Sequence, residues 1–196
     1  FNSTAKAHIF RNYQMENGLS HNSVWAVIQD GKGFMWFGTN EGLNRFDGKT
    51  FKIYKTVPGD SLSIGSNFIH TLFENSHGQI LVGTKCGLYL FDATKESFHH
   101  INLGSDREED VVVNRIMEDS NGNFWIACHG QGIYLLTPEL QVKRHFLYRG
   151  DKVNDIPSNF IWTLIQDHNG VIWIGSDGEG LIRFDVEAVS YTHLRA

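Results

Sequence analysis

The sequence is poor in several features that mark other classes of protein. Its 196 residues include two cysteines, three prolines and three methionines. No apolar run approaches the roughly 18 residues that a membrane-spanning helix needs. With 41% hydrophobic and 20% charged residues the composition is globular, which excludes a membrane, collagen-like or disordered class for this stretch.

Positive charge is scarce as well. Seventeen Lys and Arg residues stand against 22 Asp and Glu residues, so the net charge is -5. A DNA- or RNA-binding protein usually presents a basic face, and a nucleic-acid partner is therefore disfavoured. A 3.6-residue periodicity of useful length is also missing, which leaves little room for helices.

What the sequence does contain is an internal repeat. A frame that begins with an Asp-x-x-Gly turn at residues 30–39 returns at 75–84, 119–127 and 167–176. One position in it recurs at spacings of 45, 44 and 48 residues, and it holds Trp36, Leu81, Trp125 and Trp173. These spacings are typical of a four-stranded β-propeller blade. Because the three tryptophans follow the repeat's own period, we expect them in the core.

Each repeat contains the pattern of four short antiparallel strands. In the first, strands are predicted at 24–29, 34–39, 43–46 and 51–54, separated by turn residues. Corresponding strands are predicted at 88–91, 97–101, 133–136, 143–148 and 181–184. The predicted fold class is therefore all-β, a β-propeller with about four blades present. Its boundaries are 19–64, 65–109 and 110–157 for blades 1 to 3 and 158–188 for a fourth blade that lacks its outer strand.

Both ends of the chain differ from the repeats. In the N-terminal segment, residues 1–18, the stretch from Ile9 to Tyr13 is predicted as the outer strand that completes the last blade of the ring. Whether a signal peptide was removed before Phe1 stays open. Residues 189–196 resemble a translated sequencing adaptor and are left out of the fold prediction. A closed four-bladed ring is arithmetically possible, but we expect a ring that has been cut short.

These motifs resemble the two-component regulator propeller repeat. The resemblance is carried by Gly18-Leu19-Ser20-His21-Asn22-Ser23-Val24, by Asp30 with Gly33-Phe34-Met35-Trp36-Phe37-Gly38-Thr39, and by Gly42-Leu43-Asn44-Arg45-Phe46-Asp47-Gly48. It covers about residues 7–187. It is weaker in the second repeat, where Leu81 replaces Trp, and in the third, where Ala127 replaces Gly.

The resemblance implies the periplasmic sensor region of a hybrid two-component histidine kinase in the inner membrane of a Gram-negative bacterium. Such regions are similar to two seven-bladed propellers followed by a β-sandwich, a membrane helix and a kinase core, and they often detect breakdown products of complex carbohydrates. The implied partners are an oligosaccharide or other small molecule, the remaining blades and downstream domains, and a second copy in a homodimer. This chain has no phosphoacceptor segment or nucleotide-binding glycine motif, so we expect enzyme activity only from a full-length histidine kinase.

One rim of the blades is predicted to bind the ligand. The loop that enters the first strand and the loop that joins the second and third strands share one face of a blade, and polar loops on a rigid frame form a suitable binding surface. The scaffold residues repeat from blade to blade, but the side chains at equivalent positions of the inner strands differ. Such variation on a repeated frame is expected of a binding site. The predicted ligand-binding residues are His21, Asn22, Trp25, Asn40, Glu41, Asn67, His70, Lys85, Asn114, His129, Gln131, Asn159, Trp162, Asp177 and Glu179.

Aromatic rings combined with amides and carboxylates suit a sugar ligand. The ring faces pack on C–H groups while the polar groups bind hydroxyls. The competing interpretation is that Trp25 and Trp162 pack between blades and only support the scaffold.

No catalytic residue, metal site or cofactor is predicted. The histidines lack zinc-motif spacing, and the Asp-x-x-Gly turns lack a 12-residue calcium loop, so they are interpreted as turn formers. Cys86 and Cys128 are assigned to loops of different repeats, which argues against a disulfide. Two alternatives stay open: a protein-interaction propeller, and a propeller enzyme such as a lyase or glycoside hydrolase. The enzyme's candidate groups are Glu41, His129, Asp177 and Glu179.

Overall fold

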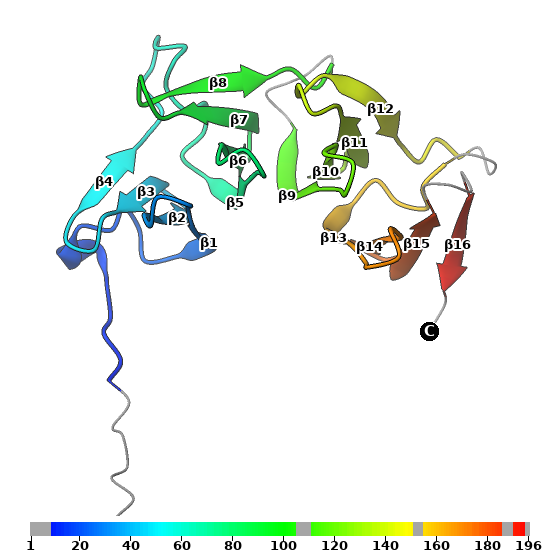
Figure 1. Cartoon of the computed structure of the whole chain (residues 1–196), viewed down its shortest axis with the longest axis horizontal. Helices are drawn as coiled ribbons and strands as arrows, with labels where there is room; N and C mark the ends of the chain where they lie inside the picture. Colours follow the sequence, from blue (N-terminus) through cyan, green and yellow to red (C-terminus); the bar gives the residue numbers. More distant parts are fainter. Residues whose placement is uncertain (1–8, 105–110, 151–154, 186–189, 195–196) are drawn as a thin grey trace, which may run out of the picture.

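The computed structural model describes residues 9–104, 111–150, 155–185 and 190–194. These residues form four antiparallel sheets of four strands each, preceded by a 3-10 turn, η1 (Met15–Asn17). The sheets stand side by side as the blades of an open arc (Figure 1). The predicted all-β propeller architecture is confirmed.

Every blade is a meander in which each strand pairs with the next along the chain. The first blade comprises β1 (Val24–Gln29), β2 (Met35–Thr39), β3 (Gly42–Phe46) and β4 (Phe51–Tyr54). The second comprises β5 (Ile69–Glu74), β6 (Ile80–Thr84), β7 (Gly87–Asp92) and β8 (Ser97–Ile101). The third comprises β9 (Val112–Glu118), β10 (Phe124–His129), β11 (Ile133–Leu136) and β12 (Val142–Phe146), and the fourth β13 (Ile161–Gln166), β14 (Ile172–Ser176), β15 (Leu181–Asp185) and β16 (Ser190–Leu194).

The first strand of each blade lies on the inside of the arc. β1 contacts β5, β5 contacts β9 and β9 contacts β13, so the four inner strands follow one another around the inside (Figure 1). Strands β4, β8 and β12 lie on the outside. This order confirms the predicted meander and leaves the inner strands to line a central space.

The hydrophobic core lies between neighbouring blades rather than within one of them. One buried cluster joins blades 1 and 2 and includes Trp36 and Phe91, a second joins blades 2 and 3, and a third joins blades 3 and 4 around Trp125 and Phe184. Neighbouring strands approach the backbone closely at Gly83. A Cβ atom at this position would collide with side-chain atoms of those strands. A blade is therefore stabilised mainly by the blades beside it.

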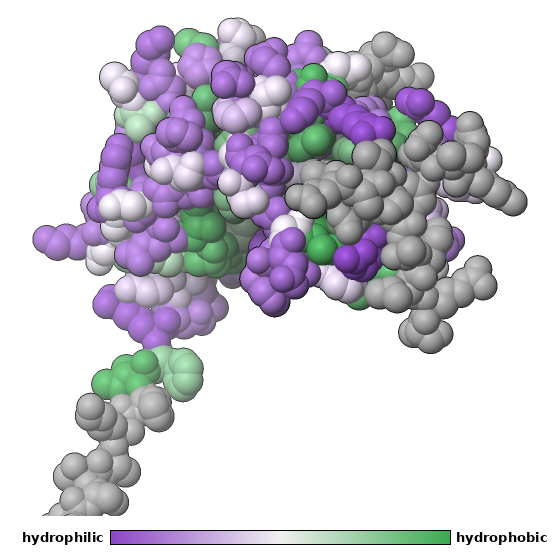
Figure 2. Space-filling model, turned by 45° about the vertical axis from the view of Figure 1, so that its right-hand side comes forward, coloured by the Kyte–Doolittle hydropathy of each residue, from purple (hydrophilic) through white to green (hydrophobic). Residues whose placement is uncertain are grey.

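The predicted core tryptophans are confirmed in two of three repeats. Trp36 and Trp125 are 1% exposed. Trp173, in the fourth blade, is half-buried because the described part of the chain places no further blade against its face. The surface in Figure 2 is largely hydrophilic, and hydrophobic side chains show mainly in its hollows and on the N-terminal extension.

The two ends of the chain bear differently on the predictions. Ile9 and Phe10 are more than 90% exposed on an extension that leaves the body, and Ile9 to Tyr13 form no strand with the four described sheets. The blade that this segment is predicted to complete is not among these four, so that role stays a prediction. Conversely, the fourth blade does have an outer strand, because residues 190–194 pair with the open edge of β15 as β16. The adaptor origin of residues 189–196 stays a prediction.

Candidate functional site

The loops at one end of the blades form what we call the variable rim. It consists of residues 20–25, 66–70, 111–114 and 158–162, which lead into the inner strands, and of the turns 39–42, 84–87, 128–132 and 176–180. The backbone N–H of Lys85 donates to the Phe68 carbonyl at 3.1 Å, and that of Asp177 donates to the Phe160 carbonyl at 2.8 Å. These contacts confirm that the two kinds of loop share one face.

A cavity of about 710 Å³ runs along the inner strands. Each of the four blades contributes one equivalent residue to its lining: Trp25, His70, Asn114 and Trp162. The sequence placed these four at corresponding positions, and the structure brings them together around one space. Because they differ chemically while the strands that hold them repeat, the lining is asymmetric.

Blades 1 and 2 contribute a first aromatic group to this rim. The rings of Phe68 and His70 stack with centroids 4.6 Å apart, and the Trp25 ring lies 5.7 Å from Phe68 and 6.3 Å from His70. Trp25 Nε1 donates to Asn40 Oδ1 at 2.5 Å, which orients the indole. Trp25 contacts the Phe68 and His70 rings of the neighbouring blade and is 59% exposed.

Blades 3 and 4 contribute a second aromatic group. The His129 ring lies 5.0 Å from Phe160 and 5.4 Å from Trp162. Trp162 contacts the His129 ring of blade 3 and is 51% exposed. Asn114 has a structural role in this part, because its Nδ2 donates to the Ile161 carbonyl at 2.7 Å and ties blade 3 to blade 4.

The surroundings of His70 make its imidazole less basic than an ordinary one. Burial lowers the pKa of His70, and the nearby charges of His129 and Lys85 lower it further. Arg115 lines the same cavity. In the described residues no carboxylate lies within ion-pair distance of Lys85, whereas Glu41 pairs with Lys55 at 3.9 Å.

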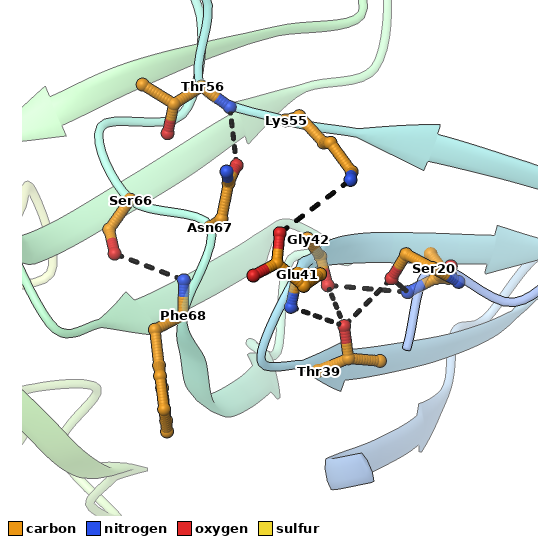
Figure 3. A network of polar contacts seen from close by, with 10 residues as sticks. Ser20, Thr39, Glu41, Gly42, Lys55, Thr56, Ser66, Asn67 and Phe68 are labelled. Carbon is orange, nitrogen blue, oxygen red and sulfur yellow. Dashed lines mark hydrogen bonds and ion pairs between the residues drawn. The ribbon is translucent and has the colours of Figure 1, made fainter. Parts of the chain in front are cut away.

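Several other predicted residues are engaged by their own loops. His21 Nδ1 accepts from the Ser23 N–H, and Asn22 Oδ1 accepts from the Met15 N–H. Asn67 Oδ1 accepts from the Thr56 N–H in the network of Figure 3, which also contains the Glu41–Lys55 pair. Asn159 repeats this arrangement against Tyr148, and the Gln131 carbonyl contacts His145 Nε2 at 2.7 Å. These contacts shape the rim, as does the bond of Ser20 to Thr39.

The candidate groups for an enzyme lie in different surroundings. Asp177 and Glu179 are exposed in one turn of blade 4. Glu41 is already paired, and His129 packs against aromatic rings. Within the described ranges, no set of three or more His, Cys, Asp or Glu side chains is arranged to hold a metal ion.

The cysteines need one correction. Both thiols are free, and Cys86 lies in a turn as predicted. Cys128, however, lies inside β10 and is fully buried, and burial raises its pKa. The error has a physical reason, since the third repeat places Cys where the others place Thr or Ser at the end of the second strand.

Sequence reasoning missed Phe68, Phe160 and Arg115. The two phenylalanines occupy the same place before an inner strand, in the sequence Ser-Asn-Phe-Ile that occurs at residues 66–69 and 158–161. That duplicated tetrapeptide was the available signal. Arg115 had none, because the repeat assigned its position to the strand without indicating that it faces the cavity.

Comparison with known proteins is consistent with this architecture. A family model described as two component regulator propeller matches residues 18–41, 108–130 and 155–178. Histidine kinase P4 of Formosa agariphila is 30% identical over an alignment of 226 residues that covers 65% of this chain and 16% of that protein. This chain therefore spans about a sixth of that relative's length.

Solved structures give the same result. A protein described as the extracellular domain of a hybrid two-component system from B. thetaiotaomicron matches with a TM-score of 0.82 and 27% identity over 94% of this chain and 26% of its own. Streptogramin B lyase matches with a TM-score of 0.65 and 14% identity over 89% of this chain and 55% of its own. At that identity the lyase shares the propeller fold alone. In the described part of the chain, no helix has the length and apolar character to cross a bilayer.

Proposed function

Since this chain carries the repeats of the two-component regulator propeller family, we propose that it forms part of the ligand-sensing region of a two-component sensor kinase. In this proposal the region lies outside the cytoplasm, in the periplasm, and detects a carbohydrate breakdown product. The kinase reaction belongs to other domains of the full-length protein, which acts with the remaining blades and as a homodimer.

One observation carries the proposal. Trp25 and Trp162 are more than half exposed on opposite blades of the arc, yet both are oriented by specific neighbours at the mouth of one cavity. Exposing two indoles costs apolar burial, which a scaffold role would not require. Indole faces that flank a polar cavity suit a pyranose, whose C–H groups stack on the rings while its hydroxyls reach polar side chains.

The alternatives have less support. A lyase or glycoside hydrolase needs convergent acid and base groups, and the paired Glu41 and the two exposed acids of blade 4 do not supply them. A polypeptide partner would favour a broad apolar rim, whereas the aromatic rings here surround a cavity.

The test titrates the full chain with a panel of oligosaccharides. Binding is measured by tryptophan fluorescence and by calorimetry. We expect one saccharide class to bind, and we expect Trp25→Ala and Trp162→Ala to weaken it by roughly tenfold each, the usual worth of one stacked ring. Phe10→Ala is the matched control, because Phe10 is an exposed aromatic residue on the N-terminal extension. Binding that is unchanged in both tryptophan variants would refute the site.

A further inference from the structure

Each blade has two faces that take part in packing. We call the face toward the preceding blade the leading face and the face toward the next blade the trailing face. The leading faces of blades 2, 3 and 4 each contain two buried aliphatic residues of the inner strand: Ile69 and Leu72, Val113 and Ile116, and Ile161 and Leu164. The trailing faces opposite blades 2 and 3 are shaped to receive the first residue of the pair, since a Cβ atom at Gly38 would collide with Ile69 and one at Gly83 with Val113.

The leading face of blade 1 has the same aliphatic pair but no blade against it. Val24 and Val27 occupy the positions of Ile69 and Leu72, as the pairing of β1 with β2 and of β5 with β6 shows. They are 40% and 55% exposed at one open end of the arc (Figure 1). Exposing two aliphatic side chains that every other junction buries costs free energy, so this face favours a partner.

The trailing face of blade 4 lies at the other open end of the arc (Figure 1). Gly175 occupies the position of Gly38, and a Cβ atom there would meet only Thr163 of its own blade. Ile165 and Leu181 belong to the same face and are 63% and 45% exposed. This face therefore retains the small residue and the apolar surroundings that receive a β-branched side chain at the junctions within the chain.

A side chain at the hairpin end of blade 1 already has the orientation of a junction residue. Gln166 Oε1 accepts from the Ser120 N–H of the preceding blade at 2.8 Å, while its Nε2 donates to the Gly170 carbonyl of its own turn at 3.2 Å. Gln29 is held in the same way, since its Nε2 donates to the Gly33 carbonyl at 3.3 Å. Among the described residues Gln29 Oε1 accepts no hydrogen bond, and by analogy with Gln166 it requires a donor from a preceding blade.

Blade 4 contains the matching donors. The His168 N–H directly follows the first residue of the hairpin turn, as do the junction donors of the other three blades, and it has no acceptor in the described part of the chain. At the opposite end, Gly180 occupies the position of Gly132, whose N–H donates to the Asn159 carbonyl of the next blade at 2.9 Å. The position of Asn159 in blade 1 is occupied by Asn22.

We propose that two copies of this chain associate head to tail, with the trailing face of blade 4 in one copy packed on the leading face of blade 1 in the other. Gly175 of one copy then receives Val24 of the other, and the His168 N–H donates to Gln29 Oε1. Two copies bring twice the four blades of one chain, which is the upper end of the range of about four to eight blades in propellers, so two such junctions can close a ring. The inference goes beyond the proposed function, whose homodimer is that of the full-length kinase.

The first experiment measures the mass of the full chain by analytical ultracentrifugation at rising protein concentration. We expect the mass to increase from that of one chain to that of two. A chain that stays monomeric at every concentration overturns the inference and leaves both faces to the remaining blades of the proposed function. Species that keep growing with concentration overturn the closed ring.

The second experiment tests the direction of the contact with one variant on each face. Val27→Asp changes only the leading face of blade 1, and Ile165→Asp changes only the trailing face of blade 4; both residues are exposed, so the fold of one copy should be kept. Each variant alone should associate more than about a hundredfold more weakly, because the contact would bury an unpaired carboxylate. Val142→Asp is the matched control, because Val142 is exposed on the outer strand β12.

Mixing the two variants gives the sharpest result. The Val27→Asp chain keeps an intact trailing face and the Ile165→Asp chain an intact leading face, so an equal mixture should form a dimer through one junction. A mixture that stays monomeric overturns the head-to-tail contact. Undiminished association of either variant alone overturns it as well, because the copies would then pair through identical faces.

The third experiment tests the hydrogen bond at the hairpin end. Gln29→Ala should weaken the association roughly three- to tenfold, the net contribution of one hydrogen bond. Gln29→Glu is the matched control and should retain the association, because Glu74 and Glu118 accept the same bond at two junctions within the chain. Equal association of Gln29→Ala and the original chain overturns this alignment of the two faces.

Discussion

The two ends of the blades use their side chains in opposite ways. At the end opposite the variable rim, the turns 30–34, 75–79, 119–123 and 167–171 form what we call the hairpin rim. Here the same contacts recur in every blade: the Gly N–H donates to the first residue's carbonyl at 2.8 to 3.0 Å, and that residue's N–H donates back across the turn at 2.9 Å. On the variable rim the N–H groups of Gly42, Gly87 and Gly132 each donate to a carbonyl of the next blade, but among the described residues no side-chain contact there recurs in all four blades.

The hairpin rim also repeats its side-chain chemistry. In blades 1, 3 and 4 the turn aspartate accepts from the indole Nε1 of the repeat tryptophan at 2.8 to 2.9 Å. Blade 2 has Asn75 in place of the aspartate and Leu81 in place of the tryptophan. Leu81 has no side-chain N–H, so Asn75 accepts only from backbone N–H groups of its own turn. The turn-forming role predicted for the Asp-x-x-Gly motif is confirmed.

Contacts between blades follow the same rule. The last residue of an inner strand accepts a hydrogen bond from the hairpin turn of the preceding blade in three cases: Glu74 to Gly31, Glu118 to Ser76 and Gln166 to Ser120. Repeated contacts therefore hold neighbouring blades together at both rims, and the proposed ligand-binding residues are among those that do not repeat.

The largest effect is expected from removing one hairpin-rim carboxylate. Asp119 is buried and accepts from Trp125 Nε1 and from the N–H groups of Asn121 and Asn123. Asp119→Ala leaves these donors without a partner and should lower the free energy of unfolding by about 2 to 4 kcal/mol in urea denaturation. Asp177→Ala on the variable rim is the matched control and should change it by less than about 0.5 kcal/mol. A similar decrease in the free energy of unfolding in the two variants would show that the two rims do not differ in their contribution to stability.

A smaller effect is expected from one contact between blades. Glu118 accepts from the Ser76 N–H at 2.7 Å and from the Ser76 hydroxyl at 2.6 Å. Glu118→Ala should lower the free energy of unfolding by about 1 kcal/mol, because the site is open to water that replaces part of the interaction. Glu179→Ala on the variable rim is the control. An unchanged midpoint of urea denaturation in Glu118→Ala would show that this contact does not stabilise the packing of the blades.

The smallest effect concerns acid. The hydrogen bond from Trp173 Nε1 holds the pKa of Asp167 below its ordinary value. The unfolded chain therefore binds a proton more readily, so the stabilisation is present above about pH 4 and is lost as pH falls through the lowered pKa. Between about pH 5 and pH 2 the free energy of unfolding should fall less steeply in Asp167→Asn and in Trp173→Phe than in the original chain. Equal slopes in all three proteins would contradict this assignment.

Much of the fold followed from the repeat, and parts of the site did not. The strands predicted at 24–29, 51–54, 97–101 and 133–136 have the observed bounds, and the others differ by one or two residues at their ends. The group around Trp25, His70 and Trp162 was predicted as a set, but Asn67 and Asn159 proved to brace their loops. A polar residue in a turn looks the same in sequence whether it caps a backbone group or faces a ligand.

The sequence by itself determined the blade: its four strands, its turn chemistry and its core tryptophans. These features are local and recur from blade to blade, although blade 2 has Leu81 in place of tryptophan and Asn75 in place of aspartate, and this repetition distinguishes scaffold from variation. Only the tertiary structure decided which of the varying residues meet. Trp25, His70, Asn114 and Trp162 belong to four blades, and they line one cavity because the arc places the inner strands of neighbouring blades side by side. The exposure of Trp25 and Trp162 was decided in the same way, since burial depends on which blades stand beside a residue and not on the residue alone.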